Sequence, residues 1–442
     1  MLMINKFLNY LKYSYHRPSA KFEHFLVLIF KIFFLSKTKI FSEKIMLLKF
    51  PPLSMIYLNS LGRLLYISIN ILSVLFFRKF VDKSISIENF LLKEKNEKSN
   101  RSIGNDLETW PPQATHLFEK NIEVEDTFFD RIYLSYIKIL KEKDAELKDS
   151  PWWNDLRIEF RKKFLTNNFV NKDNIINFRN EIDTKSAILR EQNSTLSSKN
   201  SRFINMTNAI FLISLYHKYS NFVDLKILRS ISDSKSGNNR CVVYRGQRLN
   251  QRILRYSYYM SQLINNTNIK YEDKIVICDI GGGYGGLIRL LKHYFINSTC
   301  ILIELPETCL LASYFLKNNF PDSKVLLYSD FEDLGGDVNL KQYDFIILPQ
   351  NMIKKLKNKS IDLTINTSSL SEMKNETQDF YFTEIERITN KYFYSVNRHK
   401  FKEQKYNAQG FYNLKFQKRW DTIIYNFTHT YQLEFLGRIN EK

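Results

Sequence analysis

The densest run of glycine in the chain lies at residues 281–286, which read Gly-Gly-Gly-Tyr-Gly-Gly. Residues without a Cβ atom allow positive φ angles and let a ligand approach the backbone closely. The β-branched run 275–278 before the turn is typical of a buried strand, and residues 287–295 have helical periodicity. A strand, a glycine-rich turn and a helix whose first N–H groups face a ligand are the parts of a nucleotide-binding βα unit.

A carboxylate precedes this turn. Asp279 stands two residues before Gly281. There it would repel a pyrophosphate but attract a cation, such as the amino and sulfonium groups of S-adenosylmethionine (SAM). The position therefore favours SAM over NAD and disfavours an NAD-dependent oxidoreductase. A glycine turn that binds nothing is the structural alternative.

A second carboxylate, Glu304, ends the next predicted strand, residues 300–305, 25 positions after Asp279. An acidic residue at the tip of the second strand of such a unit reaches the ribose hydroxyls of a nucleotide. Glu304 is therefore a candidate ribose ligand, with a solvent-facing glutamate at a strand end as the alternative.

The third strand has two candidates, residues 324–330 and residues 343–350. The C-terminal end of that strand should contact the adenine, because ligands of open α/β sheets bind at the carboxyl edge. We predict Asp330 as the adenine contact, with Gln350 as the alternative.

The remaining strands follow the same pattern. Residues 361–373 predict the next strand, with Asn366 to Ser368 at its C-terminal mouth, and residues 391–397 predict another. Residues 422–439 alternate well enough for two neighbouring strands. A terminal β-hairpin on a doubly wound sheet is the usual ending of a SAM-dependent methyltransferase, and a dehydrogenase would not need one.

Three segments in order carry a resemblance. They read D-I-G-G-G-Y-G-G, I-E-L-P-E and D-L-T-I-N-T-S-S-L-S-E-M, and the lead-in at residues 237–263 is similar too. Together they resemble a family of bacterial sugar O-methyltransferases within the class I SAM-dependent methyltransferases. The glycine motif is common to the whole class, whereas S-L-S-E-M points to the family. The resemblance covers roughly residues 230–442.

This resemblance implies an α/β fold with a Rossmann-like sheet, SAM as methyl donor, and a sugar hydroxyl in surface polysaccharide or glycan biosynthesis as acceptor. Carried over by position, four residues would contact the methionine part of SAM and one would hold its ribose. They are Asp279, Gly281, Gly283 and Gly285 for methionine and Glu304 for ribose.

Methyl transfer to a hydroxyl requires a base, which typically contributes about 10²–10⁴-fold. His399 follows a predicted strand and has a suitable ordinary pKa, and Glu372 follows the strand that ends in Asn366. A surface histidine and a carboxylate at a helix start are the alternatives. Asp330 lies in an acidic cluster, residues 330–333, but loop carboxylates are usually solvated, and we predict no metal.

The N-terminal segment is apolar and basic. Residues 1–80 hold 12 Lys and Arg against two acidic residues, so they carry more than half of the chain's net charge of +19. Residues 25–35 and 56–77 are strongly apolar. Three interpretations stay open, namely helices packed in a protein core or on a partner, peripheral contact with a membrane surface, and a membrane span. We expect a cytoplasmic protein, with membrane contact at the inner face as a hypothesis.

We divide the chain into a basic apolar segment (1–95), a helical region (96–230) and a methyltransferase domain (231–442). The four cysteines form no C-x-x-C pair, which fits a reducing compartment. A nucleic-acid methyltransferase is disfavoured because the charge excess lies outside the catalytic region and residues 366–369 read N-T-S-S rather than N-P-P-Y. Besides a sugar and a nucleic-acid methyltransferase, a non-catalytic protein with this fold is the third function that we consider.

Overall fold

The computed structural model describes nine stretches of the chain. They are residues 86–87, 124–141, 151–166, 169–179, 202–239, 241–335, 338–398, 420–428 and 432–440. The predicted base His399 and the apolar segments at residues 25–35 and 56–77 lie outside them. Within the described part of the chain, no helix combines the length and the hydrophobicity that crossing a membrane requires.

The chain forms two compact units. The smaller contains, among the described residues, 86–87, 202–228 and 241–254, and the larger contains the others. Helices α10 (Leu225–Ser230) and α11 (Gln251–Asn266) each pass from one unit to the other. This division cuts the chain at different places from the three segments predicted from sequence, because residues 124–179 belong to the same unit as the sheet.

The smaller unit combines one long helix with a short antiparallel sheet. Its elements are α9 (Arg202–Tyr219), β1 (Ser86–Ile87), β4 (Val242–Tyr244) and β5 (Gln247–Leu249), with sheet order β1-β4-β5. Arg245 and Gly246 connect β4 to β5, both with positive φ, as a tight two-residue hairpin requires. Nε2 of His217 lies 3.0 Å from the hydroxyl of Tyr244, which ties the helix to the hairpin.

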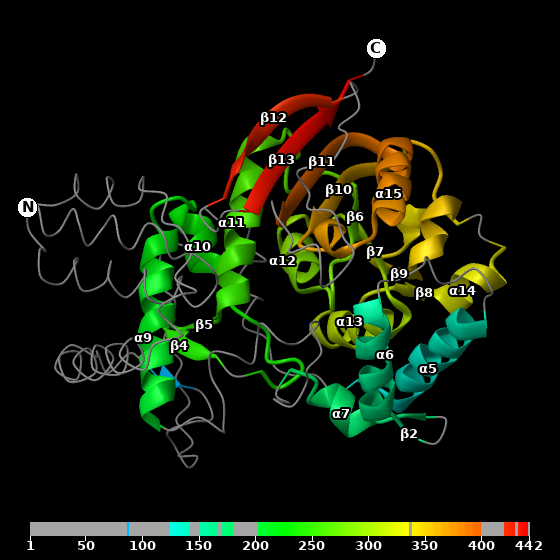
Figure 1. Cartoon of the computed structure of the whole chain (residues 1–442), viewed down its shortest axis with the longest axis horizontal. Helices are drawn as coiled ribbons and strands as arrows, with labels where there is room; N and C mark the ends of the chain where they lie inside the picture. Colours follow the sequence, from blue (N-terminus) through cyan, green and yellow to red (C-terminus); the bar gives the residue numbers. More distant parts are fainter. Residues whose placement is uncertain are drawn as a thin grey trace, which may run out of the picture. The chain divides into compact units, whose positions relative to one another are not determined.

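The larger unit is built on a sheet that has eight strands within the described residues, in the order β12-β13-β11-β10-β6-β7-β9-β8 (Figure 1). The strands are β6 (Val276–Ile280), β7 (Thr299–Glu304), β8 (Val325–Leu327), β9 (Phe345–Pro349), β10 (Ile361–Thr367), β11 (Thr389–Arg398), β12 (Trp420–Phe427) and β13 (Gln432–Ile439). Neighbours from β11 to β8 are parallel, and β13 runs antiparallel to both β11 and β12.

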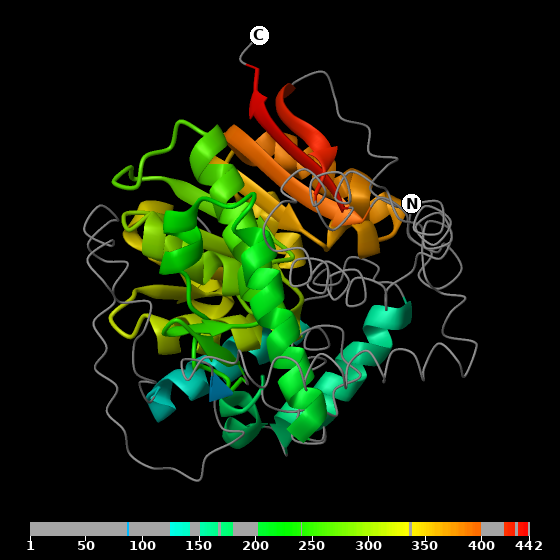
Figure 2. The same ribbon diagram turned by 90° about the vertical axis from the view of Figure 1, so that its left-hand side faces the viewer.

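One antiparallel strand inserted near the end of a parallel sheet is the topology of class I methyltransferases. The predicted Rossmann-like α/β fold with a terminal antiparallel hairpin is therefore confirmed. In Figure 2 the hairpin strands, in red, lie beside the orange β11. The strand order also shows which of the two candidate segments takes the third position. Because β9 pairs with β7 and β8 lies outside β9, residues 345–349 take the place beside the second strand.

Helices and short 3-10 turns connect the strands. They are α12 (Gly286–Tyr294), α13 (Pro306–Asn319), α14 (Tyr328–Asp333), η4 (Leu340–Gln342), η5 (Gln350–Lys355), η6 (Leu370–Glu372) and α15 (Asn375–Ile388). Helix α13 packs against β7, β8 and β9, and α15 packs against β11. Every residue of β6, β7 and β9 is buried, as expected of parallel strands covered on both faces.

Three helices precede the sheet in sequence, of which the first two pack against α13 and the third packs against the second. They are α5 (Asp126–Lys141), α6 (Pro151–Phe164) and α7 (Lys172–Ile176), with the hairpin β2 (Leu165–Thr166) and β3 (Phe169–Val170) between the last two (Figure 1). Glu307 of α13 is completely buried, and the Nε atoms of Arg157 and Arg161 each lie 2.8 Å from one of its carboxylate oxygens. Two charge-assisted hydrogen bonds offset the cost of burying that carboxylate.

Candidate functional site

The glycine turn between β6 and α12 needs its glycines. Gly281, Gly283 and Gly285 have φ angles of 72°, 65° and 87°. A Cβ atom on Gly281 would lie 2.1 Å from Oγ of Ser369, whereas a Cβ on Gly283 would meet nothing within 4 Å. The turn is therefore closely packed at its first glycine and open at Gly283, where a ligand can approach the backbone.

Asp279 is the exceptional polar group of this site. Its side chain is completely buried, and neither carboxylate oxygen has a hydrogen-bond partner among the described residues. Burial raises the pKa of Asp279 to about 7. Buried polar groups in folded proteins are nearly always hydrogen-bonded, so an unpartnered carboxylate beside an open glycine turn marks a place for a ligand with cationic or N–H donor groups.

Glu304 lies next to this carboxylate at the end of β7. Its two oxygens accept hydrogen bonds from the backbone N–H groups of Gly283 and Leu305, the second at 3.1 Å. Burial raises the pKa of Glu304 to about 8, although both N–H groups act in the opposite direction. Glu304, which we predict to bind the ribose, therefore accepts a hydrogen bond from Gly283, the position at which the turn is open.

The N-T-S-S segment at the mouth of β10 supports this turn from the other side. Nδ2 of Asn366 and Oγ of Ser369 donate to the carbonyl of Ile280, at 2.7 and 3.1 Å. Asn397 of β11 donates in turn to Oδ1 of Asn366 at 2.7 Å. The strand-end position of Asn366 was visible in the sequence, whereas the roles of Ser369 and Asn397 depend on pairing between strands and were missed.

A further buried carboxylate, Glu434 of β13, was also missed. It accepts hydrogen bonds from the hydroxyls of Tyr258 and Tyr394, at 2.6 and 2.7 Å. Burial raises the pKa of Glu434, and the two hydroxyl groups partly oppose that rise. Glu434 is paired with Val396, which is also paired with Thr367, so this cluster lies level with the mouth of β10.

The predicted base Glu372 ends η6, just after the mouth of β10. Its Oε1 lies 3.3 Å from Nη1 of Arg398, the last residue of β11. The ion pair holds the Glu372 carboxylate at the carboxyl edge of the sheet. With His399 outside the described residues, both base candidates stay predictions.

Of the two adenine candidates, Gln350 follows the strand that neighbours β7, and Asp330 follows the outer strand β8. Oδ2 of Asp330 is bonded to Nη2 of Arg131 at 2.8 Å and to the N–H of Leu327 at 3.0 Å. The prediction of Asp330 as the adenine contact is untested, but strand order favours the alternative, Gln350.

The acidic cluster around Asp330 is bonded to helix α5. Nζ of Lys138 lies 2.6 Å from Asp333 and 3.7 Å from Glu332. Across the described residues, no group of three His, Cys, Asp or Glu side chains is arranged to hold a metal ion. These carboxylates therefore attach α5 to α14.

No protein-family model and no curated protein matches the chain. Among solved structures, it is similar to a SAM-dependent methyltransferase from Aquifex aeolicus, with 13% identity over 38% of this chain and 84% of that chain and a TM-score of 0.25. A protein from Pyrococcus horikoshii OT3 shows 14% identity over 41% of this chain and 92% of that chain, with a TM-score of 0.28. Geranyl diphosphate C-methyltransferase from Streptomyces coelicolor A3(2) shows 12% identity over 33% and 46%, with a TM-score of 0.23. The fold assignment rests on the chain's own strand order.

Proposed function

We propose that the chain is a SAM-dependent O-methyltransferase that methylates a sugar hydroxyl in surface polysaccharide or glycan biosynthesis. The observation that carries the SAM assignment is the buried, unpartnered carboxylate of Asp279 beside the open backbone of Gly283. A cationic ligand matches that carboxylate better than a pyrophosphate does. The sugar acceptor rests on the resemblance of the segments around the glycine turn and residues 361–373 to sugar O-methyltransferases.

Bound SAM would supply an activated methyl group on a positively charged sulfur. In this proposal Asp279 and the glycine turn hold the methionine part, and Glu304 accepts hydrogen bonds from the ribose hydroxyls. Much of the rate of an in-line displacement comes from alignment of the two reactants. The braced turn serves that purpose, because Asn366 and Ser369 fix the carbonyl of Ile280 immediately before it.

The acceptor hydroxyl must lose a proton during transfer. We propose that Glu372 or His399 is the base that accepts this proton, since both follow strands at the carboxyl edge of the sheet. Glu372→Gln and His399→Ala separate the two. The variant that lacks the base should keep its Kd for SAM and lose about 10²-fold or more in kcat.

Residues 1–80 are proposed to lie on the inner face of the membrane, near a lipid-linked acceptor. The support is their charge, 12 basic against two acidic residues, interleaved with apolar runs. Flotation of the intact chain and of a chain lacking residues 1–80 with anionic vesicles tests this. Equal recovery of both proteins in the soluble fraction would contradict it.

The function itself is tested by calorimetric titration of SAM, and separately NADH, into the full-length protein. We expect SAM to bind and NADH not to bind, and Asp279→Ala to abolish SAM binding. Asp362→Asn is the matched control, because Asp362 is also a buried strand aspartate but is bonded to the N–H of Val276.

Incubation with methyl-labelled SAM and a panel of sugar nucleotides, lipid-linked glycans and RNA then identifies the acceptor. Label in a sugar supports the full proposal, and label in RNA would replace its acceptor. Failure of the intact protein to bind SAM would refute the methyltransferase assignment.

A further inference from the structure

Tyr284 is the only residue of the glycine turn that has a side chain beyond hydrogen. That side chain is 1% exposed, so it is directed into the protein interior. Its ring centre lies 4.7 Å from that of Phe315 on α13 and 5.5 Å from that of Phe178, which follows α7. The turn therefore has an aromatic anchor on the side away from open solvent, and part of the socket comes from residues long before the sheet.

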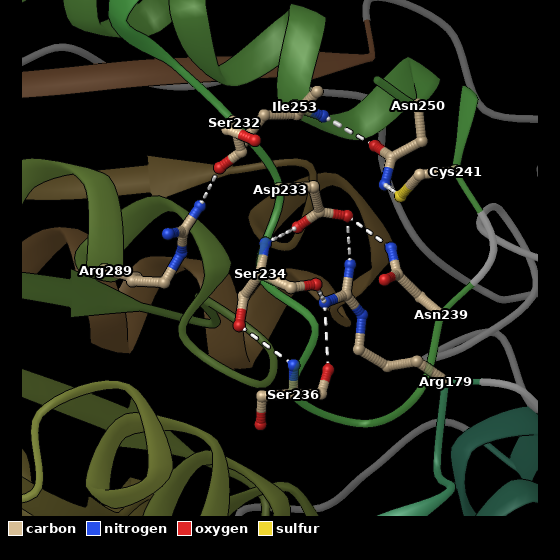
Figure 3. A network of polar contacts seen from close by, with 10 residues as sticks. All are labelled: Arg179, Ser232, Asp233, Ser234, Ser236, Asn239, Cys241, Asn250, Ile253 and Arg289. Atoms are coloured by element: carbon tan, nitrogen blue, oxygen red, sulfur yellow. Dashed lines mark hydrogen bonds and ion pairs between the residues drawn. The ribbon is translucent and has the colours of Figure 1, made fainter. Parts of the chain in front are cut away.

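Arg179 completes this socket. The carbon of its guanidinium group lies 5.1 Å from the centre of the Tyr284 ring, within the range of a cation–π interaction. The same side chain is completely buried and forms an ion pair with Asp233. Its Nη1 donates to the carbonyls of Ser234 and Ser236, each at 3.1 Å (Figure 3).

The segment that receives Arg179, residues 231–239, contains no helix or strand and is mostly buried. Asp233 in this segment also accepts from the N–H of Ser234 at 2.9 Å and from the side chain of Asn239 (Figure 3). A Cβ on Gly237 would lie 2.7 Å from Cγ and Cδ of Arg179. Position 237 therefore has room for the Arg179 side chain only because it is glycine.

The segment also contacts the helix that follows the turn. Arg289 of α12 is 2% exposed, and its Nη2 donates to the carbonyl of Ser232 (Figure 3). Two buried arginines thus join residues 231–239 to the glycine turn and to its helix. Burying a guanidinium group is costly unless it is paired, and the ion pair with Asp233 offsets part of that cost for Arg179.

We propose that Arg179, held by Asp233, is a positioning residue that fixes Tyr284 and thereby sets the glycine turn in its cofactor-binding conformation. The inference rests on the proposed SAM binding. A turn with five glycines is costly in entropy to order, and a side-chain anchor ordered before binding lowers that cost for the ligand. Residues 171–179 would then belong to the cofactor site, although they lie outside the segment that resembles known methyltransferases.

The test is Arg179→Lys in the full-length protein, with SAM affinity measured by calorimetry and Tm measured without SAM. Lysine keeps the charge beside Asp233, but cannot stack on Tyr284 while bonding two carbonyls and a carboxylate. We expect SAM to bind about tenfold more weakly, equal to about 1.4 kcal/mol. Arg387→Lys is the matched control, since Arg387 also binds Glu384 and two carbonyls, those of Ile353 and Leu356.

Tyr284 supplies an independent pair of variants if Arg179→Lys does not fold. Tyr284→Leu removes the ring and should weaken SAM binding to a similar extent, whereas Tyr284→Phe keeps the ring and should bind SAM normally. A lower Tm with unchanged SAM affinity in the folded variants would overturn the inference, because it would show a structural role alone. If the protein without substitutions does not bind SAM, the proposed function itself is refuted.

Discussion

Two buried carboxylates at the sheet's carboxyl edge differ in their hydrogen bonds, Asp279 in the half that holds the glycine turn and Glu434 in the half that holds the mouth of β10. At the end of β6, Asp279 is buried with no hydrogen-bond partner among the described residues. At the level of the mouth of β10, Glu434 is equally buried, but each of its oxygens accepts a tyrosine hydroxyl. Because unpartnered buried carboxylates are rare, this contrast supports our proposal that a ligand completes the first half, whereas Glu434 has its partners within the protein.

The asparagines of the second half lead to the same conclusion. Asn366 and Asn397 are completely buried and bonded to each other, and Asn366 also holds the carbonyl of Ile280. The hydrogen bonds of these side chains are made within the protein. The N-T-S-S segment is thus first a support for the glycine turn.

The largest effect is expected from Asp279→Asn, which tests the carboxylate that has no partner. It removes the charge that SAM would meet, and we expect affinity for SAM to fall by about 100-fold, or roughly 2.7 kcal/mol. The same variant should raise the Tm of the cofactor-free protein at pH 8.5, because it removes an ionised carboxylate from an apolar site. Calorimetry and thermal denaturation check the two effects, and a variant that lost stability as well would show that Asp279 is structural.

The opposite result is expected for Glu434→Leu. It removes the acceptor of the buried Tyr394 hydroxyl and one hydrogen bond of Tyr258, and should lower the free energy of unfolding by about 2 kcal/mol. SAM affinity should not change. Restoring stability by adding Tyr394→Phe would confirm the cause, because the variant would then no longer bury the Tyr394 hydroxyl without its acceptor. Weakened SAM binding in the folded variant would contradict the division into two halves.

The pH dependence of stability sharpens the comparison further. The pKa values of Asp279, about 7, and Glu304, about 8, lie above those of unfolded carboxylates, so the folded state binds more protons than the unfolded state between about pH 4 and pH 8. Stability of the cofactor-free protein should therefore fall as pH rises from 6 to 8.5, by roughly 1 kcal/mol or more. SAM affinity should rise over the same range, since the cation favours ionised carboxylates.

Denaturant titrations at each pH, with and without SAM, measure both trends. Asp279→Asn should reduce each trend, and Glu304 should account for the pH dependence that remains. Stability that rises with pH in the unchanged protein would contradict the burial of these two carboxylates.

The smallest effect is expected at the adenine candidates. Asp330→Ala removes a partly exposed ion pair with Arg131 and should change SAM affinity by less than about twofold. Gln350→Ala should weaken SAM binding several-fold, because Gln350 directly follows β9, the strand beside β7. A titration that ranked the two variants in the reverse order would restore Asp330 as the adenine contact.

The sequence by itself determined the features that are local along the chain. The β6–turn–α12 unit, Asp279 and the terminal hairpin were all readable, because strand period, glycine φ and helix period act over a few residues. The fold class followed from the order of these local units. Glu304 was found for the same reason, as it ends the strand that comes next in sequence.

Tertiary structure alone decided which groups meet across the sheet and behind the turn. Only pairing showed that β9 rather than β8 neighbours β7, and that Glu434 meets Tyr258, which lies 176 residues earlier. The same holds for Arg179, whose contact with Tyr284 joins an arginine beyond α7 to the glycine turn. Long-range packing selects such partners by shape and charge, and no spacing pattern in a single sequence records them.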